Sequence, residues 1–172
     1  NPKPLFSVLL ALIHYTHNWG LFLSAGPVCA LVPCWYVSEV RSSFWKDALI
    51  GFGFAGLLYL PWLPTLLHQV QHTGAPWLNP PNFGAPIQIT KSLLGGGTPT
   101  VALVLAGGSG LAAVIARRVE DKERTAVLAG AVTVLGTLAV AWLVSQVSPA
   151  WTTRYLGVLL GPMLLVAALG LS

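Results

Sequence analysis

The sequence predicts an all-α protein, a polytopic transmembrane helical bundle with about six membrane segments and one long extracytoplasmic loop. Two observations predict this class. Hydrophobic residues make up 55% of the chain and charged residues only 8%, against about 25% charged residues in an ordinary soluble domain. The charges also gather in two short stretches that separate long apolar segments. A mean hydropathy of +0.72 is that of a chain that exposes its side chains to lipid.

Six apolar segments approach the length of about 20 residues that a helix needs to cross a bilayer. They are residues 4–16, 19–38, 48–67, 100–116, 126–147 and 155–171. The first is too short to cross alone, the chain begins with Asn1, and no signal-peptide pattern is present. We therefore expect residues 1–172 to form a single transmembrane helical domain that is a fragment of a longer chain.

The charge distribution predicts the orientation of these segments. All five acidic residues and six of the nine cations lie within residues 39–47 and 117–124. Short loops rich in Lys and Arg are retained in the cytoplasm, so both stretches are expected inside and residues 68–99 and 148–154 outside. The outer face then holds two cations, Lys91 and Arg154, and no carboxylate. This pattern predicts a multi-pass protein of the plasma (inner) membrane.

Proline and glycine interrupt the predicted helices at two places. Pro61 and Pro64 are expected to bend the outer end of the third segment, because proline removes a backbone donor and crowds the preceding turn. The Pro-rich and Gly-rich stretch 68–99 cannot be one regular helix. Within it, residues 87–94 are expected to form a short interfacial helix with Ile87 and Leu94 on its apolar face and Lys91 toward the head groups.

Close contact between helices is expected in the fourth segment. Gly107, Gly108 and Gly110 fall together there, and small residues allow helix backbones to approach closely in a bilayer.

Arg154 is the leading candidate for a residue that binds a lipid phosphate. It opens the last segment, where a guanidinium reaches the level of lipid phosphates and can bind one through two parallel hydrogen bonds. Lys91 is a second candidate for the same role. The alternative is an Arg154 side chain that extends to ordinary phospholipid head groups without specific recognition. Aromatic residues at the outer ends, Trp19 among them, are expected mainly as an interfacial belt.

The histidines suggest weaker hypotheses. His14 lies inside an apolar segment, where an ionisable group is costly and is a functional candidate, although a hydrogen-bonded structural role is the alternative. His68 and His72 have the spacing of a helical metal pair, but no carboxylate or thiolate lies near them, so we expect no metal. The sequence contains no nucleotide-binding pattern, and the basic residues follow the topology, so neither a cofactor nor a nucleic-acid partner is expected.

Three stretches carry a resemblance to a known family. They are residues 14–23 (HYTHNWGLFL), 59–71 (YLPWLPTLLHQVQ, followed by PWLNPP) and 148–171 (SPAWTTRYLGVLLGPMLLVAALGL). Their order, spacing and shared outer location resemble the later portion of polytopic membrane glycosyltransferases of the C superfamily. The similar branch is the dolichyl-phosphate-mannose protein-mannosyltransferase-like one, common in actinobacteria.

The resemblance implies a function for this chain. Such enzymes transfer a sugar, here of mannose type, from a polyprenyl-phosphate donor to an acceptor at the outer face of the membrane. Arg154, Tyr155 and Lys91 would bind the donor phosphate, and His17, His68 and Gln69 would line the cavity. The catalytic carboxylate would lie upstream of Asn1, so the fragment alone is expected to be inactive. Its partners would be the lipid-linked donor, membrane lipids and other membrane subunits.

Two other classes are compatible with the chain. A non-catalytic subunit or scaffold of a larger membrane complex needs no outer carboxylate. Half of a transporter is disfavoured, because the polar clusters gather at one interface and transporter sites lie near the midplane.

The predicted topology is testable by cysteine labelling from outside the cell, in a background where Cys29 and Cys34 are replaced by serine. Asn82→Cys should react with a membrane-impermeant thiol reagent and Asp121→Cys should not, because the cation-rich stretches stay inside. Labelling at position 121 without labelling at position 82 would contradict the topology.

Overall fold

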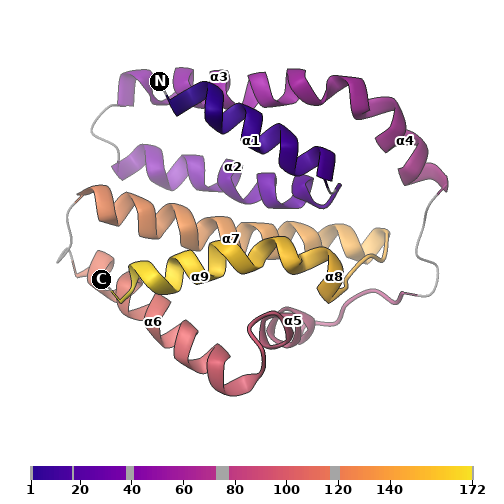
Figure 1. Cartoon of the computed structure of the whole chain (residues 1–172). Coiled ribbons are helices and arrows are strands. Elements are labelled where there is room, and N and C mark those ends of the chain that lie inside the picture. Colours follow the sequence, from indigo (N-terminus) through magenta and orange to yellow (C-terminus); the bar gives the residue numbers. More distant parts are fainter. Residues whose placement is uncertain (1, 17, 38–40, 73–77, 117–120, 172) are drawn as a thin grey trace.

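Every regular element in the described residues is a helix, as expected from the composition (Figure 1). The structure, a computed structural model, describes residues 2–16, 18–37, 41–72, 78–116 and 121–171. The helices are α1 (Pro2–Thr16), α2 (Gly20–Val37), α3 (Arg41–Tyr59), the 3-10 turn η1 (Leu60–Trp62), α4 (Leu63–His72), α5 (Ala85–Leu93), α6 (Gly97–Ile115), α7 (Asp121–Val147), α8 (Thr153–Leu156), the 3-10 turn η2 (Gly157–Leu159) and α9 (Leu160–Leu169).

Three helical stretches are long and apolar enough to cross a membrane. They are Arg41–His72, Gly97–Ile115 and Glu123–Val147. Shorter apolar helices occupy Pro4–Thr16, Gly20–Tyr36 and Thr153–Leu169. At a rise of about 1.5 Å per residue, the shorter helices fall below the roughly 30 Å of a bilayer core.

Two helices begin earlier than the apolar segments predict. α3 starts at Arg41 and α7 at Asp121, whereas the apolar runs begin at residues 48 and 126. Lys, Arg and Glu have good helix propensities, so a charged stretch at the end of a span extends the helix when it contains no Pro or Gly. The expected loops are therefore shorter than the charge pattern suggested.

The expected bend at Pro61 and Pro64 is confirmed. The 3-10 turn Leu60–Trp62, with proline at its start, separates α3 from α4. Figure 1 shows the chain turning there, so that α4 leaves the line of α3 and descends past the end of the bundle.

The long connection between α4 and α6 contains a helix, as predicted, and its most buried residue is Ile89, which was not named from the sequence. α5 covers Ala85–Leu93, where Ile89 is 6% exposed and Ile87 is 63% exposed. Residue 89 points inward because it packs against α7, α8 and η2. After α5 the chain reverses through Gly95 and Gly96, whose φ angles of 86° and 123° favour glycine.

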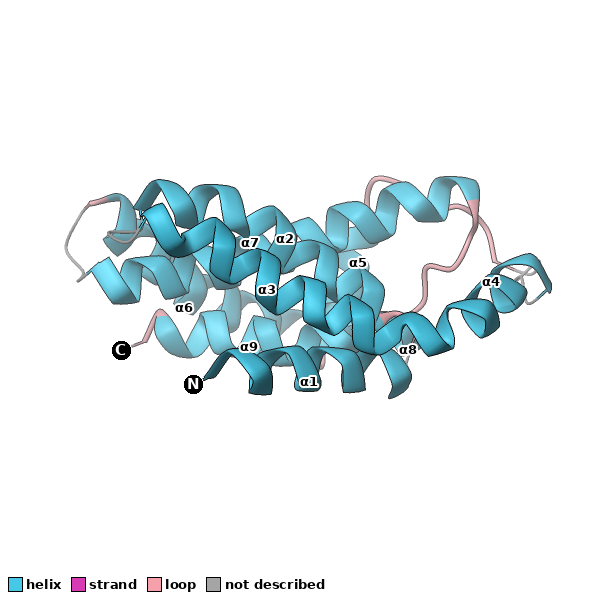
Figure 2. Cartoon of the chain, turned by 90° about the horizontal axis from the view of Figure 1, so that it is seen from above, coloured by secondary structure: helices cyan, strands magenta, loops and turns pink. Residues whose placement is uncertain are grey.

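The helices form layers, and α7 joins α2 to α6 and α9. α1 packs on α3, α2 packs along α7, and α9 packs on both α7 and α6. Figure 1 shows α1 and α3 above, α2 and α7 in the middle, and α9 and α6 below, and Figure 2 shows the same bundle from above. α7 is the longest of these helices and runs through the centre.

The contact between α2 and α7 is very close. A methyl group placed on Gly26 would overlap the carbonyl oxygen of Thr133 and the hydroxyl of Thr137. A methyl group on Gly136 would lie 3.2 Å from Cβ of Cys29. Small residues on both helices thus let the two backbones touch, which maximises dispersion contacts where lipid offers no hydrophobic driving force.

The predicted close contact in the fourth segment is confirmed at two of its three glycines. Cβ atoms on Gly107 and Gly110 would meet Val166 and Gly170 of the last helix and its cap, at 3.1 and 2.8 Å. Gly108 has nothing within 4 Å and points away from the contact.

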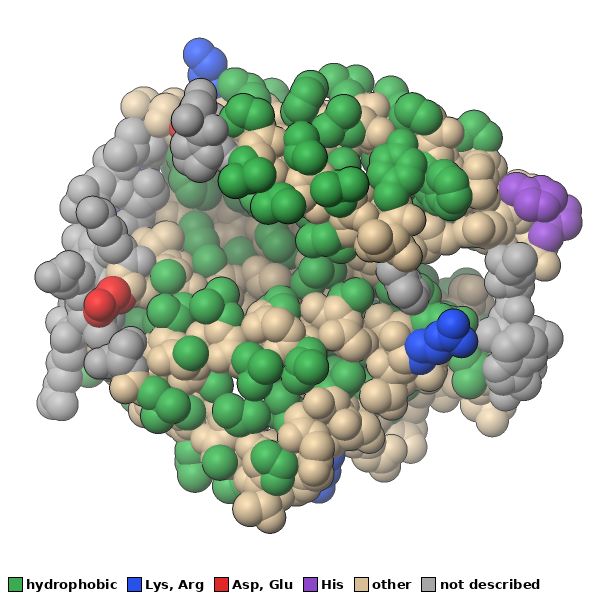
Figure 3. Space-filling view, viewed as in Figure 1, with side chains coloured by type: hydrophobic (Ala, Val, Ile, Leu, Met, Phe, Trp, Pro, Cys, Tyr) green, Lys and Arg blue, Asp and Glu red, His purple; other side chains and the backbone are tan. Residues whose placement is uncertain are grey.

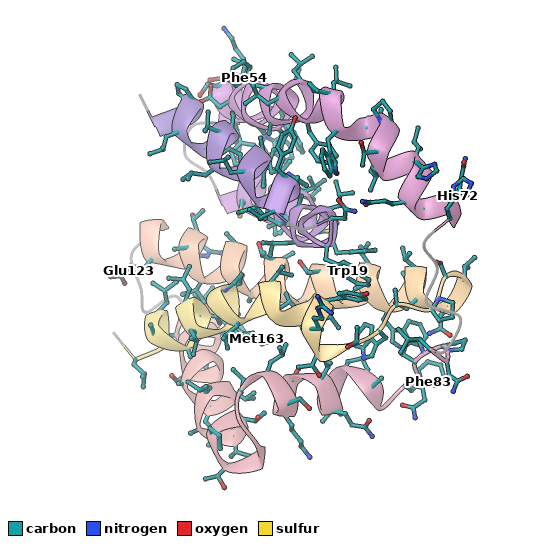
Figure 4. The ribbon with its side chains drawn as sticks, turned by 45° about the vertical axis from the view of Figure 1, so that its right-hand side comes forward. Trp19, Phe54, His72, Phe83, Glu123 and Met163 are labelled. Carbon is teal, nitrogen blue, oxygen red and sulfur yellow. The ribbon has the colours of Figure 1, made fainter. Side chains whose placement is uncertain are left out.

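The two ends of the bundle differ in polar chemistry. We call the end where α3 and α7 begin (Arg41 and Glu123) the charged end, and the end where α1 and α7 finish (Thr16 and Val147) the histidine end. In Figure 3 the visible acidic side chain lies at the left edge of a broad apolar face, and the exposed histidines lie at the right edge. Figure 4 labels Glu123 and His72 on these opposite sides.

Gly26→Ala should destabilise the bundle by about 1–3 kcal/mol, because the added methyl group overpacks the contact between α2 and α7. Gly53→Ala is the matched control, since nothing lies within 4 Å of a Cβ on Gly53. The free energy of unfolding in mixed micelles measures both. Equal effects of the two substitutions would show that the α2–α7 contact is not close.

Candidate functional site

A buried apolar cluster positions the helices at the histidine end. Ile89 of α5, Ala141 of α7, Leu156 of α8 and Leu159 of η2 pack together, and the last three are fully buried. Leu156 and Leu159 are completely buried, and the many dispersion contacts of such side chains hold the short α8 turn on α7.

The α8 turn points consecutive side chains in different directions. Thr152 is extended, and its carbonyl oxygen accepts hydrogen bonds from the N–H groups of Tyr155 and Leu156, both at 3.1 Å. Leu156 enters the core, Tyr155 is half-buried, and Arg154 is exposed. Because successive helical residues are about 100° apart, the turn that anchors Leu156 holds Arg154 on the outside.

Aromatic rings form one wall beside this turn. The Trp19 ring stacks on Tyr155 with centroids 4.9 Å apart and planes 13° apart, and it lies 4.4 Å from the Phe22 ring. Figure 4 shows Trp19 between the ribbons at the start of α2 and α8. Tyr15 meets the Trp62 ring edge-on at 5.7 Å, an arrangement that aromatic pairs favour.

Two carboxamides join α4 to the turn between α1 and α2. Nδ2 of Asn18 donates a hydrogen bond to Oε1 of Gln69, and Nε1 of Trp62 donates to Oδ1 of Asn18 at 3.3 Å. Trp62, Leu66 and Gln69 have the helical spacing that places them on one face, and all three are half-buried. The bend at η1 therefore turns this face of α4 toward α1 and α2.

These walls line a partly open cavity of about 590 Å³ at the histidine end, within the range of about 300–1,000 Å³ typical of small-molecule sites. Among the described residues, its lining combines aromatic rings, aliphatic side chains and a few polar groups, and none of these side chains is charged. The lining residues are Tyr15, Thr16, Asn18, Trp19, Leu21, Phe22, Trp62, Leu66, Gln69, Val70, Val144, Ser148, Pro149, Ala150 and Tyr155.

The structure brings together two of the residues named from the sequence. Gln69 of α4 and Tyr155 of α8 both line the cavity. His68 is exposed and does not line this cavity, because it lies about 100° around α4 from Gln69. His17 lies outside the described residues.

The two predicted phosphate-binding cations, Lys91 and Arg154, are exposed and do not line the cavity. α5 packs against α8, so these side chains come from neighbouring elements. Each lies two residues from a buried anchor, Ile89 or Leu156, and therefore on the outward face of its helix. Arg154 stands outside the cavity, next along the chain to the lining residue Tyr155, whereas Lys91 belongs to α5, from which no described residue lines the cavity.

Of the two roles considered for His14, the structure shows the surroundings of the structural one, a buried and hydrogen-bonded side chain. It is 6% exposed, its Nδ1 lies 2.6 Å from the carbonyl oxygen of Leu10, and its Nε2 lies 2.9 Å from the Ser24 hydroxyl. Nδ1 must donate to the carbonyl, so in the neutral ring Nε2 accepts from Ser24. His14 thus ties α1 to α2 and does not line the cavity.

The exposed pair His68 and His72 stacks with ring centroids 4.2 Å apart, and Nδ1 of His72 lies 2.9 Å from the His68 carbonyl oxygen. Across the residues the structure describes, no group of three or more His, Cys, Asp or Glu side chains gathers where a metal ion would need them.

Trp62 was not predicted from the sequence to line a cavity, and Trp19 was expected as a belt residue at the membrane interface. Tryptophan is common at membrane interfaces, so composition gives no reason to place either ring in a cavity. The useful signal was the helical spacing of Trp62, Leu66 and Gln69 after the double-proline bend.

No protein-family model, curated protein or solved structure matches this chain.

Asn18→Ala should lower the free energy of unfolding by about 1–3 kcal/mol, because the Trp62 indole and the Gln69 carboxamide both lose a partner in a half-buried site. Thr16→Val is the matched control, since the Thr16 hydroxyl donates only to the carbonyl oxygen of Ile13 in its own helix, at 2.9 Å. Equal, small effects would mean that the carboxamides do not fasten α4 to the bundle.

Proposed function

We propose that the chain is the later, donor-binding part of an integral-membrane glycosyltransferase. It moves a mannose-type sugar from a polyprenyl-phosphate donor to an acceptor at the outer face of the plasma membrane. The observation that carries the proposal is the cavity at the histidine end, with Tyr155 on its wall and Arg154 exposed on the same helical turn.

The proposed topology has six membrane segments with the charged end in the cytoplasm. The described helices support it, because α3 and α7 both begin at the charged end, while α1 and α7 both finish at the histidine end. The short helices α1, α2 and α8–α9 pack against longer ones, which lets them cross as part of a bundle. The cavity then opens at the outer membrane interface, where a lipid-linked donor places its head group.

The two cations suit the donor phosphate for an electrostatic reason. All five carboxylates of the sequence lie within residues 39–47 and 120–123, so in this topology no acid competes with the phosphate for Arg154 or Lys91. A guanidinium binds phosphate through two parallel hydrogen bonds, and its charge stabilises the phosphate as the sugar leaves.

The remaining step is activation of the acceptor hydroxyl. A general base must take its proton as the bond from the sugar C1 to the phosphate oxygen breaks and the new glycosidic bond forms. The lining residues that the structure describes include no carboxylate, so the base would come from the upstream outer loop that the family resemblance implies.

The same lack of a carboxylate favours a second candidate, a non-catalytic membrane subunit that binds a lipid-linked ligand for a partner enzyme. An Asp or Glu in an outer loop just after the first span of the parent chain would separate the enzyme from the subunit.

The phosphate-binding role of Arg154 is testable with polyprenyl phosphate in nanodiscs. Arg154→Lys keeps the charge but loses the two-pronged geometry, and loss of a charge-assisted hydrogen bond of about 1.5–3 kcal/mol should weaken binding roughly 10- to 150-fold. Arg154→Ala should bind more weakly still.

Lys46→Ala on α3 is the matched control, because it removes an exposed cation from the charged end and should leave binding unchanged. If Arg154→Lys binds as tightly as the original protein, Arg154 only reaches toward ordinary head groups, as a long cationic side chain does.

A further inference from the structure

The cavity is separated from the cations Arg154 and Lys91. Both cations are exposed, and none of the lining residues that the structure describes carries a charged side chain. A group that enters the cavity exchanges water for aromatic rings, aliphatic side chains and neutral polar groups. An ionised group would lose part of its hydration there, and the described lining supplies no opposite charge to compensate, which is unfavourable. The lining therefore favours an uncharged occupant.

The polar groups of the lining suit an occupant with several hydroxyl groups. Asn18 and Gln69 each carry two N–H donors and an oxygen with two lone pairs, and they face each other across a hydrogen bond. A carboxamide can both donate to and accept from a hydroxyl. The pair can therefore share or exchange this bond with hydroxyl groups of a ligand that lies between α4 and the turn before α2.

The aromatic lining suits the other face of such a ligand. Tyr15, Trp19, Trp62 and Tyr155 all contribute to the cavity, and a sugar ring has an apolar face of C–H groups that packs on an aromatic ring. Aromatic rings bury a large area at a low cost in conformational entropy, and their polar N–H and O–H groups reach hydrogen-bond partners. Aromatic rings and a pair of carboxamides that line one cavity match the two kinds of surface that a sugar presents.

We propose that this cavity binds the glycosyl group of the donor and is selective for neutral sugars over sugars that carry a carboxylate. The inference rests on the proposed function for the identity of the donor, and it adds which part of that donor enters the cavity. The phosphate stays outside, at Arg154, one residue along the chain from the wall residue Tyr155. The phosphate and the sugar are thus bound by different chemistry on two sides of one helical turn.

The test uses ligands without a phosphate, so that it is independent of Arg154. The full chain in neutral phosphatidylcholine nanodiscs is cross-linked with an octyl β-glucoside that carries a photoreactive diazirine in its alkyl chain, and the adducts are mapped by mass spectrometry. Unlabelled octyl β-glucoside, octyl β-glucuronide and octyl tetraethylene glycol ether then compete. The glucuronide differs from the glucoside by a carboxylate in place of the hydroxymethyl group, and the ether has no sugar.

We expect adducts on the cavity-lining parts of α2, α4 and the stretch 148–155. Octyl β-glucoside should compete at a concentration about 10-fold or more below that of either other compound, equivalent to at least about 1.4 kcal/mol of preference. Gln69→Leu should remove most of this preference, and Ser92→Ala, an exposed substitution on α5, should retain it.

Equal competition by the glucuronide would overturn the selectivity for neutral sugars, and equal competition by the ether would overturn sugar recognition. Both comparisons use the unaltered protein, so they do not depend on whether Gln69→Leu folds. If either result is obtained while Arg154-dependent binding of polyprenyl phosphate persists, this inference fails and the proposed function stands. If octyl β-glucoside competes selectively but polyprenyl phosphate does not bind, the proposed function fails and sugar binding in the cavity stands.

Discussion

The close contact between α2 and α7 is the constraint on which the candidate site depends. α7 runs through the centre of the bundle and contributes Val144 to the cavity near its end, while Trp19 lies directly before the start of α2. Gly26 allows the two backbones to touch, and this contact sets how far apart the two walls lie. A wider separation would move Trp19 away from Tyr155, which the Leu156 anchor holds on α7.

The helices themselves could be predicted from the sequence because apolar runs of this length have few alternatives in a membrane. The breaks at Pro61 and Pro64 were also predictable, since proline acts locally. The pairing of α2 with α7 was not. When lipid and protein interior are equally apolar, hydrophobic periodicity does not distinguish the packed face from the lipid face. Ile89 and Ile87 show this, because either could have been the buried residue of α5.

The candidate site could be predicted only in part. Gln69 and Tyr155 were recognisable because polar and aromatic residues gather at helix ends at the histidine end of the bundle. The cavity itself depends on Asn18 meeting Gln69, a contact between residues 51 positions apart, and no local pattern reveals such a meeting. The outward direction of Arg154 follows from the buried position of Leu156, which is also a property of the folded core. The structure thus separates a neutral cavity from an exposed cation that the sequence placed side by side.

The most direct test of this account is an experimental structure of the chain in a nanodisc with a polyprenyl-phosphate mannose bound. The account predicts density for the mannose between Trp19 and Gln69, with the phosphate outside the cavity and within hydrogen-bonding distance of the Arg154 guanidinium. A donor bound at the charged end beside Arg41 and Lys46, or a phosphate buried among the aromatic rings, would contradict it.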